Sequence, residues 1–242
     1  MKFLPYLTLA ALAAGNAGAQ APAPTKQGIE SKGYVWNAQE GEKIEALKKK
    51  GDAENGKDAY EVCGACHLPS GAGRPDGTFP QLAGQHSTVL IKQMADIRAG
   101  LRDNPTMYPF AISLVDPQEL ADAAAYIAGL CIPRDHGTYD GKDVAQQVAG
   151  GKQLYEKECQ NCHGRNGEGD REKFYPVIAG QHYKYLLRQM TAIRDGKRRN
   201  ANPDMVKIIK KYSDTDLVAI SAYQASLEMP GAMCKVAAPK KK

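Results

Sequence analysis

The sequence predicts an all-α fold made of two tandem copies of one small helical domain. The chain aligns with itself when residue 80 is placed on residue 176, an offset of 96 residues. A repeat of this length is a duplicated domain rather than one unit of a solenoid. Apolar residues recur at helical spacing in each half, and each half reads as helices only. A chain of 242 residues is long enough for two small domains.

Each copy is expected to contain three helices. The first helices span residues 55–65 and 151–161, and the second helices follow an Ala-Gly-Gln-His turn in each half. The third helix opens at Asp116, an N-cap residue that is followed by proline at the first helical position, and its copy opens at Ser213. A further helix is expected at residues 40–50, ahead of the first copy.

The repeat and the composition of its flanks suggest a domain plan. We expect a signal peptide at residues 1–19, an N-terminal extension at 20–50, a first domain at 51–135, a polar, Gly-rich linker at 136–145, a second domain at 146–236 and a basic tail at 237–242.

Residues 1–19 have the pattern of a secretory signal peptide. Lys2 is followed by an apolar stretch at residues 3–14 and by an Ala-Gly-Ala cleavage site that ends at Ala19. The stretch is shorter than the ~20 residues that a spanning helix needs, although an uncleaved anchor is the alternative. The mature protein is therefore expected in the periplasm.

The composition is that of a globular protein, with 43% hydrophobic and 24% charged residues. A net charge of +5 spread over the whole chain is too weak to indicate nucleic-acid binding. Only 7% of the residues are aromatic, which is few for a chain that has cores to fill. A bound apolar cofactor would fill the gap.

The cysteines identify that cofactor. Four of the six stand in the sequences Cys63-Gly64-Ala65-Cys66-His67 and Cys159-Gln160-Asn161-Cys162-His163. C-x-x-C-H is the attachment motif of c-type haem, in which both thiols form thioethers and the histidine ligates the iron. A single chance match has an expectation of about 0.003 in this composition. A redox C-x-x-C or a zinc site would need a context that is absent here. We therefore expect two covalently bound haem c groups, with His67 and His163 as axial ligands.

Each half offers a methionine and a histidine for the sixth position on iron. Met107 and Met205 both follow the sequence Asn-Pro-x, and a proline-stiffened loop could hold a thioether against iron without a helix behind it. Met/His ligation raises the reduction potential. His86 and His182 are the rival ligands, but as residues at a helix start they are expected to face solvent or a propionate. Met94 also repeats, at a core spacing within a helix where methionine usually fills space.

Pro80 and Pro176 each follow their haem histidine by 13 residues. The carbonyl of either proline could accept a hydrogen bond from the imidazole Nδ1–H and thus orient the ligand. A simple turn proline is the alternative.

With these motifs, the chain resembles the two-haem cytochrome c4 family. The shared pattern is C-x-x-C-H, P-x-L-A-G-Q, G-x-R, N-P-x-M and a helix that ends near Tyr126 or Tyr223, and it covers residues 51–230 in two copies. The resemblance implies two tandem class I cytochrome c domains, related by a pseudo-twofold axis, with the haem propionate edges facing each other.

The resemblance also assigns roles to individual residues. It implies that Met107 and Met205 are the sixth ligands of the two irons. It implies that the carbonyls of Pro80 and Pro176 accept hydrogen bonds from the ligand imidazoles. Arg102 and Arg198 are implied to contact haem propionates. It further implies that the first and last helices of each domain cross, with Gly56 and Tyr60 against Tyr126, and Gly151 and Tyr155 against Tyr223.

Two features depart from the family pattern. The extension at residues 20–50 is longer than usual, and its Trp36 could either cap the first core or dock a partner. Cys131 and Cys234 are additional cysteines, and each stands just after the last helix of its half. Because a pseudo-twofold axis can bring equivalent positions together, we hypothesise an inter-domain disulfide; two separate thiols are the alternative.

These patterns predict an electron-transfer protein rather than an enzyme. It would accept electrons from a dehydrogenase or a quinol-oxidising complex and pass them to a terminal oxidase or another acceptor. One alternative is an electron-accepting subunit of a periplasmic dehydrogenase that docks through the extension. Another is a two-haem peroxidase or a thiosulfate dehydrogenase, which would need one open or Cys-ligated iron. Lysines at 207, 210, 211 and 240–242 could steer an acidic partner or allow peripheral membrane association.

Overall fold

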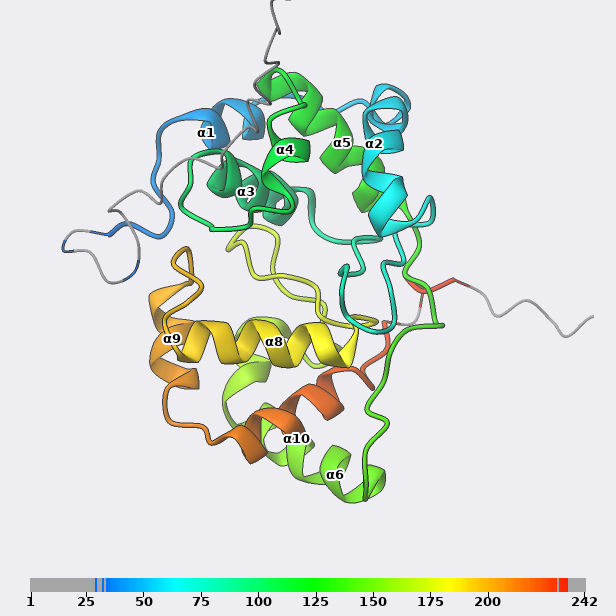
Figure 1. The fold of residues 1–242 in the computed structure, drawn as a ribbon, viewed down its shortest axis with the longest axis vertical. Coiled ribbons are helices and arrows are strands. Elements are labelled where there is room, and N and C mark those ends of the chain that lie inside the picture. Colours follow the sequence, from blue (N-terminus) through cyan, green and yellow to red (C-terminus); the bar gives the residue numbers. More distant parts are fainter. Residues whose placement is uncertain (1–28, 30–31, 33, 230, 235–242) are drawn as a thin grey trace, which may run out of the picture.

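The fold was derived from a computed structural model, which describes residues 29, 32, 34–229 and 231–234. The signal peptide and the basic tail predicted from the sequence lie outside these residues. The described residues form ten α-helices and one π-helical turn, with two isolated bridges and no strand (Figure 1). The helices are α1 (Glu42–Leu47), α2 (Ala53–His67), α3 (Ser87–Arg98), α4 (Tyr108–Ala111), α5 (Pro117–Gly129), α6 (Val144–Leu154), α7 (Gln160–His163), α8 (Tyr183–Arg194), α9 (Pro203–Ile209) and α10 (Asp214–Gln224), and the π-helical turn is η1 (Tyr155–Cys159).

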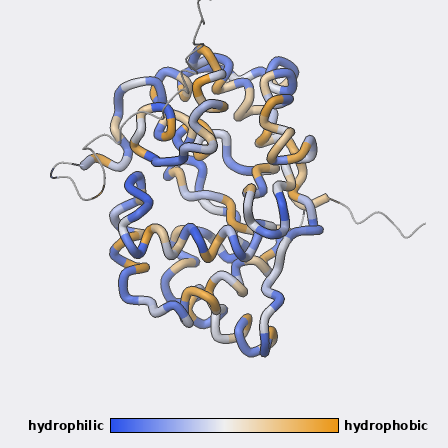
Figure 2. Tube along the Cα trace, in the orientation of Figure 1, coloured by the Kyte–Doolittle hydropathy of each residue, from blue (hydrophilic) through white to orange (hydrophobic). Residues whose placement is uncertain are grey.

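The helices form two units that are stacked one above the other in Figure 1. One unit contains α2–α5, with α1 packed on α3 and α5, and the other contains α6–α10. Hydrophobic and hydrophilic residues are interspersed along the helices of both units (Figure 2). The all-α fold with two tandem copies is therefore confirmed. No described helix combines the length and the apolar character that crossing a membrane would require.

The first and last helices of each unit cross at a glycine. A Cβ atom on Gly56 would lie 2.0 Å from the Asp122 carbonyl oxygen, and one on Gly151 would lie 1.9 Å from the Ala219 carbonyl oxygen. Both contacts are far shorter than any real Cβ contact, so only glycine lets the backbones approach this closely. The crossing expected from the resemblance is confirmed.

A tyrosine pair completes each crossing. The ring centroids of Tyr60 and Tyr126 lie 5.4 Å apart, and those of Tyr155 and Tyr223 lie 5.2 Å apart. The buried hydroxyl of Tyr60 donates to the Leu68 carbonyl at 2.9 Å, just past the first haem motif. In the second unit, the Tyr155 hydroxyl donates to the equivalent carbonyl at 2.7 Å. Each pair therefore ties the helix crossing to the segment that carries the haem motif.

The predicted starts of the third helices are correct, but one first helix begins earlier than expected. The Asp116 side chain accepts from two backbone N–H groups of α5, and Ser213 forms a capping box with Asp216. Helix α6 begins at Val144, seven residues before the expected start at Gly151. The predicted start was wrong, because Gly151 lies inside the helix at the crossing and not at its first turn.

Both Asn-Pro-x-Met segments lead into helices, which corrects the expectation of a loop without a helix behind it. Met205 lies in the first turn of α9, and Met107 is the N-cap residue of α4. The Asn202 side chain accepts from the Asp204 N–H at 2.8 Å, and Pro203 follows it as the first helical residue. Asparagine and proline in this order are a helix start, so the motif has the local chemistry of an N-cap.

The two units meet through a set of pseudo-symmetric hydrogen bonds. The Gln85 side chain both donates to and accepts from the Val177 backbone, at 2.9 Å each. At the equivalent place, the Gln181 side chain accepts from the Gln81 N–H at 3.0 Å and donates to the Gln81 carbonyl at 2.9 Å. Each Ala-Gly-Gln-His turn therefore binds the backbone of the other unit. This reciprocal pairing is what a pseudo-twofold axis requires.

The hypothesised inter-domain disulfide is present in the structure. Cys131 and Cys234 are bonded, with their Cα atoms 5.3 Å apart. A short parallel bridge stands beside the disulfide, because the Ile132 N–H donates to Ala232 at 3.0 Å and the Cys234 N–H donates to Ile132 at 2.8 Å. The end of each unit is thus tied to the end of the other.

Candidate haem-binding sites

One cavity of about 750 Å³ extends across the boundary between the two units. It is lined by both C-x-x-C-H motifs and by Met107 and Met205. The remaining wall is mostly apolar and includes residues of α3 and α5 in one unit, of α8 and α9 in the other, and of the loops between them. The cavity therefore brings the candidate ligands of both repeats into one space.

The four motif cysteines are free thiols, in contrast to Cys131 and Cys234. They are half-buried in the cavity wall, although each C-x-x-C pair stands close enough in sequence to oxidise. Burial raises the pKa of the Cys63 thiol, and it raises the pKa of Cys159 to about 12. Two pairs of unbonded thiols at the wall of an apolar cavity fit the attachment of two haem groups.

The motif histidines are oriented by backbone carbonyls. His67 is 3% exposed, and its Nδ1 lies 2.9 Å from the Pro80 carbonyl oxygen. The Nδ1 of His163 lies 3.3 Å from the Pro176 carbonyl oxygen. A hydrogen bond at Nδ1 leaves Nε2 free as a donor of electrons to a metal. Burial lowers the pKa of both imidazoles, which favours the neutral form that a metal binds.

Four methionines line the cavity, two from each unit: Met94, Met107, Met190 and Met205. Met190 is 5% exposed and belongs to a hydrophobic core cluster, whereas Met94 and Met205 are both half-buried and packed against such a cluster. Met94 and Met190 lie within the long helices α3 and α8, where methionine usually fills space, whereas Met107 and Met205 lie at the starts of the short helices α4 and α9.

The rival ligands His86 and His182 do not line the cavity. The Nε2 of His86 lies 2.8 Å from the Glu168 carbonyl oxygen, and the Nε2 of His182 lies 2.9 Å from the Ala72 carbonyl oxygen. Both contacts cross between the units. The expectation that these side chains face solvent or a propionate was wrong, because they bind the backbone of the opposite unit.

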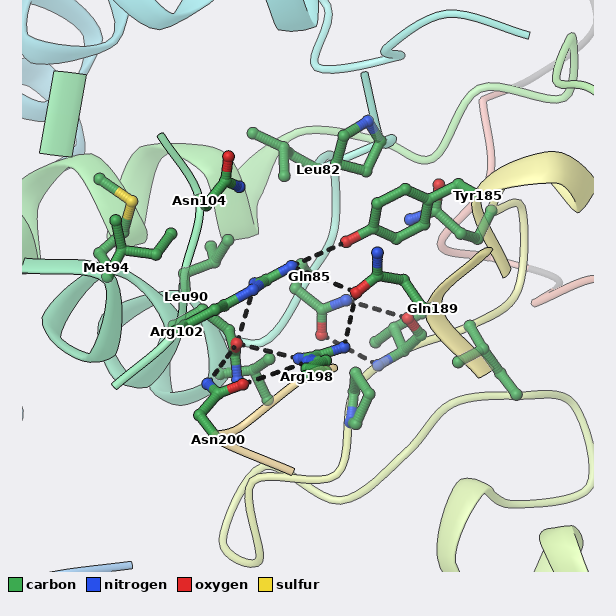
Figure 3. Close-up of a pocket in the computed structure, with 18 of the residues that line it drawn as sticks. Leu82, Gln85, Leu90, Met94, Arg102, Asn104, Tyr185, Gln189, Arg198 and Asn200 are labelled. Carbon is green, nitrogen blue, oxygen red and sulfur yellow. Dashed lines mark hydrogen bonds between the residues drawn. The ribbon is translucent and has the colours of Figure 1, made fainter. Parts of the chain in front are cut away.

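Arg102 and Arg198 converge on the domain boundary within this cavity (Figure 3). Arg102 donates to Gln93 Oε1 at 2.9 Å, and Arg198 donates to the same oxygen at 2.9 Å. Gln189 accepts from Arg198 at 3.0 Å and from Arg102 at 3.4 Å, so the glutamines of the two units are shared. Within the described part of the chain, neither guanidinium pairs with a carboxylate.

This cluster carries unneutralised positive charge. Burial, followed by the neighbouring Arg102, lowers the pKa of Arg198 to about 10, which still leaves the side chain charged at neutral pH. Two close guanidinium groups in a partly desolvated place repel each other unless an anion lies between them. Haem propionates are anions of the required kind.

Several polar residues of the cluster were missed by the sequence analysis. Lys92 is 1% exposed and pairs with Asp96 at 2.6 Å, and the Asn200 amide from the other unit donates to the same carboxylate at 2.7 Å. Gln93 and Gln189 recur at the offset of 96 residues, but nothing in the sequence assigns them a role. A buried lysine on α3 carries no sequence signal, since charged residues on a helix are ordinarily solvent-exposed.

Comparisons with known proteins agree with the fold and the cavity. The Cytochrome c family model matches residues 53–130 and 148–228. Cytochrome c4 of Pseudomonas aeruginosa is 40% identical over 180 residues, which span 72% of this chain and 87% of that protein. The crystal structure of reduced recombinant cytochrome c4 from Pseudomonas stutzeri superposes with a TM-score of 0.63 and 32% identity, over 74% of this chain and all of that one. A thiosulfate dehydrogenase electron acceptor of Stutzerimonas stutzeri is 34% identical, over 70% of this chain and 80% of that protein.

The duplicated helical domain and the paired haem motifs define a two-haem c-type cytochrome. Given these matches, the chain belongs to the cytochrome c4 family. It carries two covalent haem c groups and transfers electrons.

Proposed function

We propose that the protein is a periplasmic carrier of single electrons between a donor redox protein and a terminal oxidase or another acceptor. In this proposal the haem-carrying domains span residues 51–135 and 146–236. The donor is a dehydrogenase or a quinol-oxidising complex. The observation that carries the proposal is the cavity, in which each repeat presents its motif histidine and the methionine of its Asn-Pro-x-Met segment, beside a second methionine from α3 or α8.

The ligand set that we propose is the same in both repeats. The thioethers form at Cys63 and Cys66 and at Cys159 and Cys162, and the axial pairs are His67 with Met107 and His163 with Met205. The imidazole contacts with Pro80 and Pro176 support the histidine assignment. Met107 and Met205 line the cavity from the starts of short helices, whereas Met94 and Met190 line it from within α3 and α8, and this difference supports the methionine assignment. The use of His86 and His182 at the domain boundary supports it as well.

The chain controls the redox behaviour of its cofactors through these residues. When bound, each haem supplies a one-electron Fe(III)/Fe(II) couple. The proline carbonyls hold the imidazoles in one orientation, and a thioether ligand favours the reduced state and raises the potential. Arg102 and Arg198 neutralise the propionates at the boundary. The apolar lining excludes water, so these charges act through a low dielectric.

A catalytic role would need an iron with an open position or a thiolate ligand. Cys131 and Cys234 are the thiols left over by the haem motifs, and they are bonded to each other outside the cavity. This supports a carrier over an enzyme of the thiosulfate dehydrogenase or peroxidase type. An anaerobic reductive titration is expected to take up two electrons per chain, with no turnover of hydrogen peroxide or thiosulfate. Steady-state turnover of either substrate would overturn the proposal.

A second candidate is an electron-accepting subunit that works with one dehydrogenase. The similarity to a thiosulfate dehydrogenase electron acceptor favours this candidate. The described part of the extension does not support it, because α1 is packed on this chain's own helices α3 and α5. Purification from the native membrane and periplasmic fractions separates the two. A free carrier elutes alone, whereas a dedicated subunit elutes with its dehydrogenase.

The proposal also includes a role for exposed lysines in attracting a redox partner. Lys207, Lys210 and Lys211 are exposed on and just after α9, close in sequence to Met205. Such a group attracts an acidic surface and raises the rate of encounter. Lys211 is already paired with Glu158, which leaves the other two lysines as the principal contributors. Peripheral membrane association through residues 240–242 remains a prediction for a segment outside the described residues.

A further inference from the structure

The described part of the N-terminal extension touches both haem domains. Helix α1 is anchored in the first domain, where Ala46 is fully buried and Glu42 pairs with Arg98 at 2.9 Å. The residues before α1 contact the second domain instead. The Ile29 N–H donates to the Arg199 carbonyl at 2.9 Å, and the Tyr34 hydroxyl donates to the Ala201 carbonyl at 3.4 Å. We call the described residues from Ile29 to Leu47 the clamp segment.

Trp36 occupies the place where the clamp segment crosses the domain boundary. Its ring meets the ring of Phe174 from the second domain edge to face, with centroids 6.3 Å apart. The Lys92 ammonium of the first domain lies over the indole, 5.0 Å from its centroid. Trp36 and Phe174 both line the haem cavity. One indole therefore contacts both domains and forms part of the cavity wall between them.

Phe174 is held in an unusual conformation for this contact. Its φ of 57° lies in the left-handed region, which costs a non-glycine residue of order 1 kcal/mol or more. The first repeat has Thr78 at the equivalent position, with no positive φ. The strained aromatic is thus confined to the domain that Trp36 meets. Contacts with the Trp36 ring and with Lys43 offset the cost of this backbone conformation. The Lys43 ammonium lies over the Phe174 ring, 5.5 Å from its centroid.

The clamp segment also adds a cation to the boundary. Lys43 is only 7% exposed, and its ammonium donates to Asn37 and Ala38. Burial lowers the pKa of Lys43, and the nearby Lys92 lowers it further, while Asp96 opposes them. Lys43 is therefore electrostatically close to the buried pair that Asn200 joins to the other domain. Positive charge at a haem boundary favours the reduced state, since reduction adds an electron.

We propose that the clamp segment fixes the two haem domains to each other on the side away from the disulfide, and that Trp36 is a positioning residue that closes the haem cavity at the domain boundary. In Figure 1 the blue segment descends from α1 on one side of the boundary, and the red end of the described chain lies on the other. Trp36 holds Lys92 and keeps water from the cationic cluster. It thereby keeps the reduction potentials of both haems high.

The test compares the midpoint potentials of the two haems in the holoprotein for the wild type and W36A, W36F and V35A. Loss of the indole admits water, which screens the cluster, so W36A lowers both midpoint potentials and increases their dependence on salt. W36F retains a ring against Phe174 and restores most of the shift. V35A changes a residue of the same segment that is 64% exposed, so it leaves both potentials unchanged.

Two outcomes overturn the proposal. One is a folded W36A protein with wild-type potentials, even if its melting temperature falls, and the other is an equal shift in V35A. If W36A yields no holoprotein, K43Q serves as the test variant. This substitution removes the buried charge of Lys43 and leaves the ring contact between Trp36 and Phe174 in place. K43Q lowers both potentials, whereas K48Q, which alters an exposed lysine at the end of α1, does not. Equal potentials in K43Q and K48Q contradict the proposal.

Discussion

His182 donates from Nε2 to the Ala72 carbonyl of the other domain at 2.9 Å, while its Nδ1 accepts from the Gly137 N–H at 3.0 Å. The two hydrogen bonds together require the neutral imidazole, because a proton on Nδ1 would face the Gly137 N–H. The side chain is fully buried. The hydrogen bond from Gly137 to this buried imidazole therefore depends on the protonation state of His182.

This geometry predicts that lowering the pH decreases the free energy of unfolding through protonation of His182. Burial lowers the pKa of His182, and nearby His136 lowers it further, while the bond to Ala72 and the charge of Asp76 oppose them. The unfolded chain, with an ordinary pKa of about 6.5, then binds the proton more readily than the folded protein. The stabilisation is present above about pH 6.5 and is lost as the pH falls.

The measurement is the free energy of unfolding of the holoprotein as a function of pH, for the wild type and H182Q. The difference between the two proteins separates His182 from the other groups that titrate in this pH range. H182Q is expected to be less stable at pH 8, with a smaller loss between pH 7 and pH 5. Parallel pH curves would show that His182 does not carry the effect.

The helix crossing predicts opposite effects for adjacent glycines in α6. The Cβ of G151A would press against the Ala219 carbonyl, and neither backbone can move without separating α6 from α10. We expect a loss of roughly 2–3 kcal/mol in the free energy of unfolding. G150A is the matched control, since nothing lies within 4 Å of its Cβ, and it should stabilise the helix by roughly 0.5–1 kcal/mol. Similar losses in both variants, measured by thermal or chemical unfolding, would contradict the crossing.

The disulfide is expected to stabilise the protein without touching either haem. Cys131 and Cys234 are separated by 103 residues, and closing a loop of that length is worth up to about 4–5 kcal/mol in the chain-entropy model. The double variant C131S/C234S should melt at a lower temperature and keep the wild-type optical spectrum. A changed spectrum would mean that one of these thiols interacts with iron.

Arg198 is expected to raise the reduction potential of the haems at the boundary. Removing one unit of positive charge from the cluster disfavours reduction by an amount of order 1 kcal/mol. R198Q should therefore show lower midpoint potentials, while R198K, which keeps the charge, should lie closer to the wild type. R171Q is the control, because Arg171 is exposed on the second domain. Equal potentials in R198Q and R171Q would argue against a propionate contact.

The local chemistry of the chain was largely predictable from its sequence, whereas the boundary between the domains was not. The Asp116 and Ser213 caps act within a few residues, so their side chains reveal the helix starts. The Asn-Pro-x-Met segments also carry a local signal, but their proline was interpreted as stiffening a loop, whereas Asn202 is an N-cap and Pro203 begins a helix.

The boundary depends on groups that a sequence pattern does not show. Gln85 and His86 bind backbone atoms of the other domain, and any residue type supplies a backbone carbonyl. Lys92 is buried because Asp96 neutralises its charge, and an amide from the other domain donates to the same carboxylate. The contacts of Trp36 are likewise with residues far away in the chain, which left its role open in the sequence.

The assignment of Met107 and Met205 as iron ligands is tested most directly by the optical spectrum of the oxidised protein. Sulfur-to-iron ligation produces a weak charge-transfer band at long wavelength, which is quantified per haem. The wild type should show the full band for both haems, M205A about half of it, and M94L an unchanged band, because Met94 lies within helix α3 and is not assigned as a ligand although it lines the same cavity. A missing or half-strength band in the wild type would contradict a carrier with two closed Met/His sites.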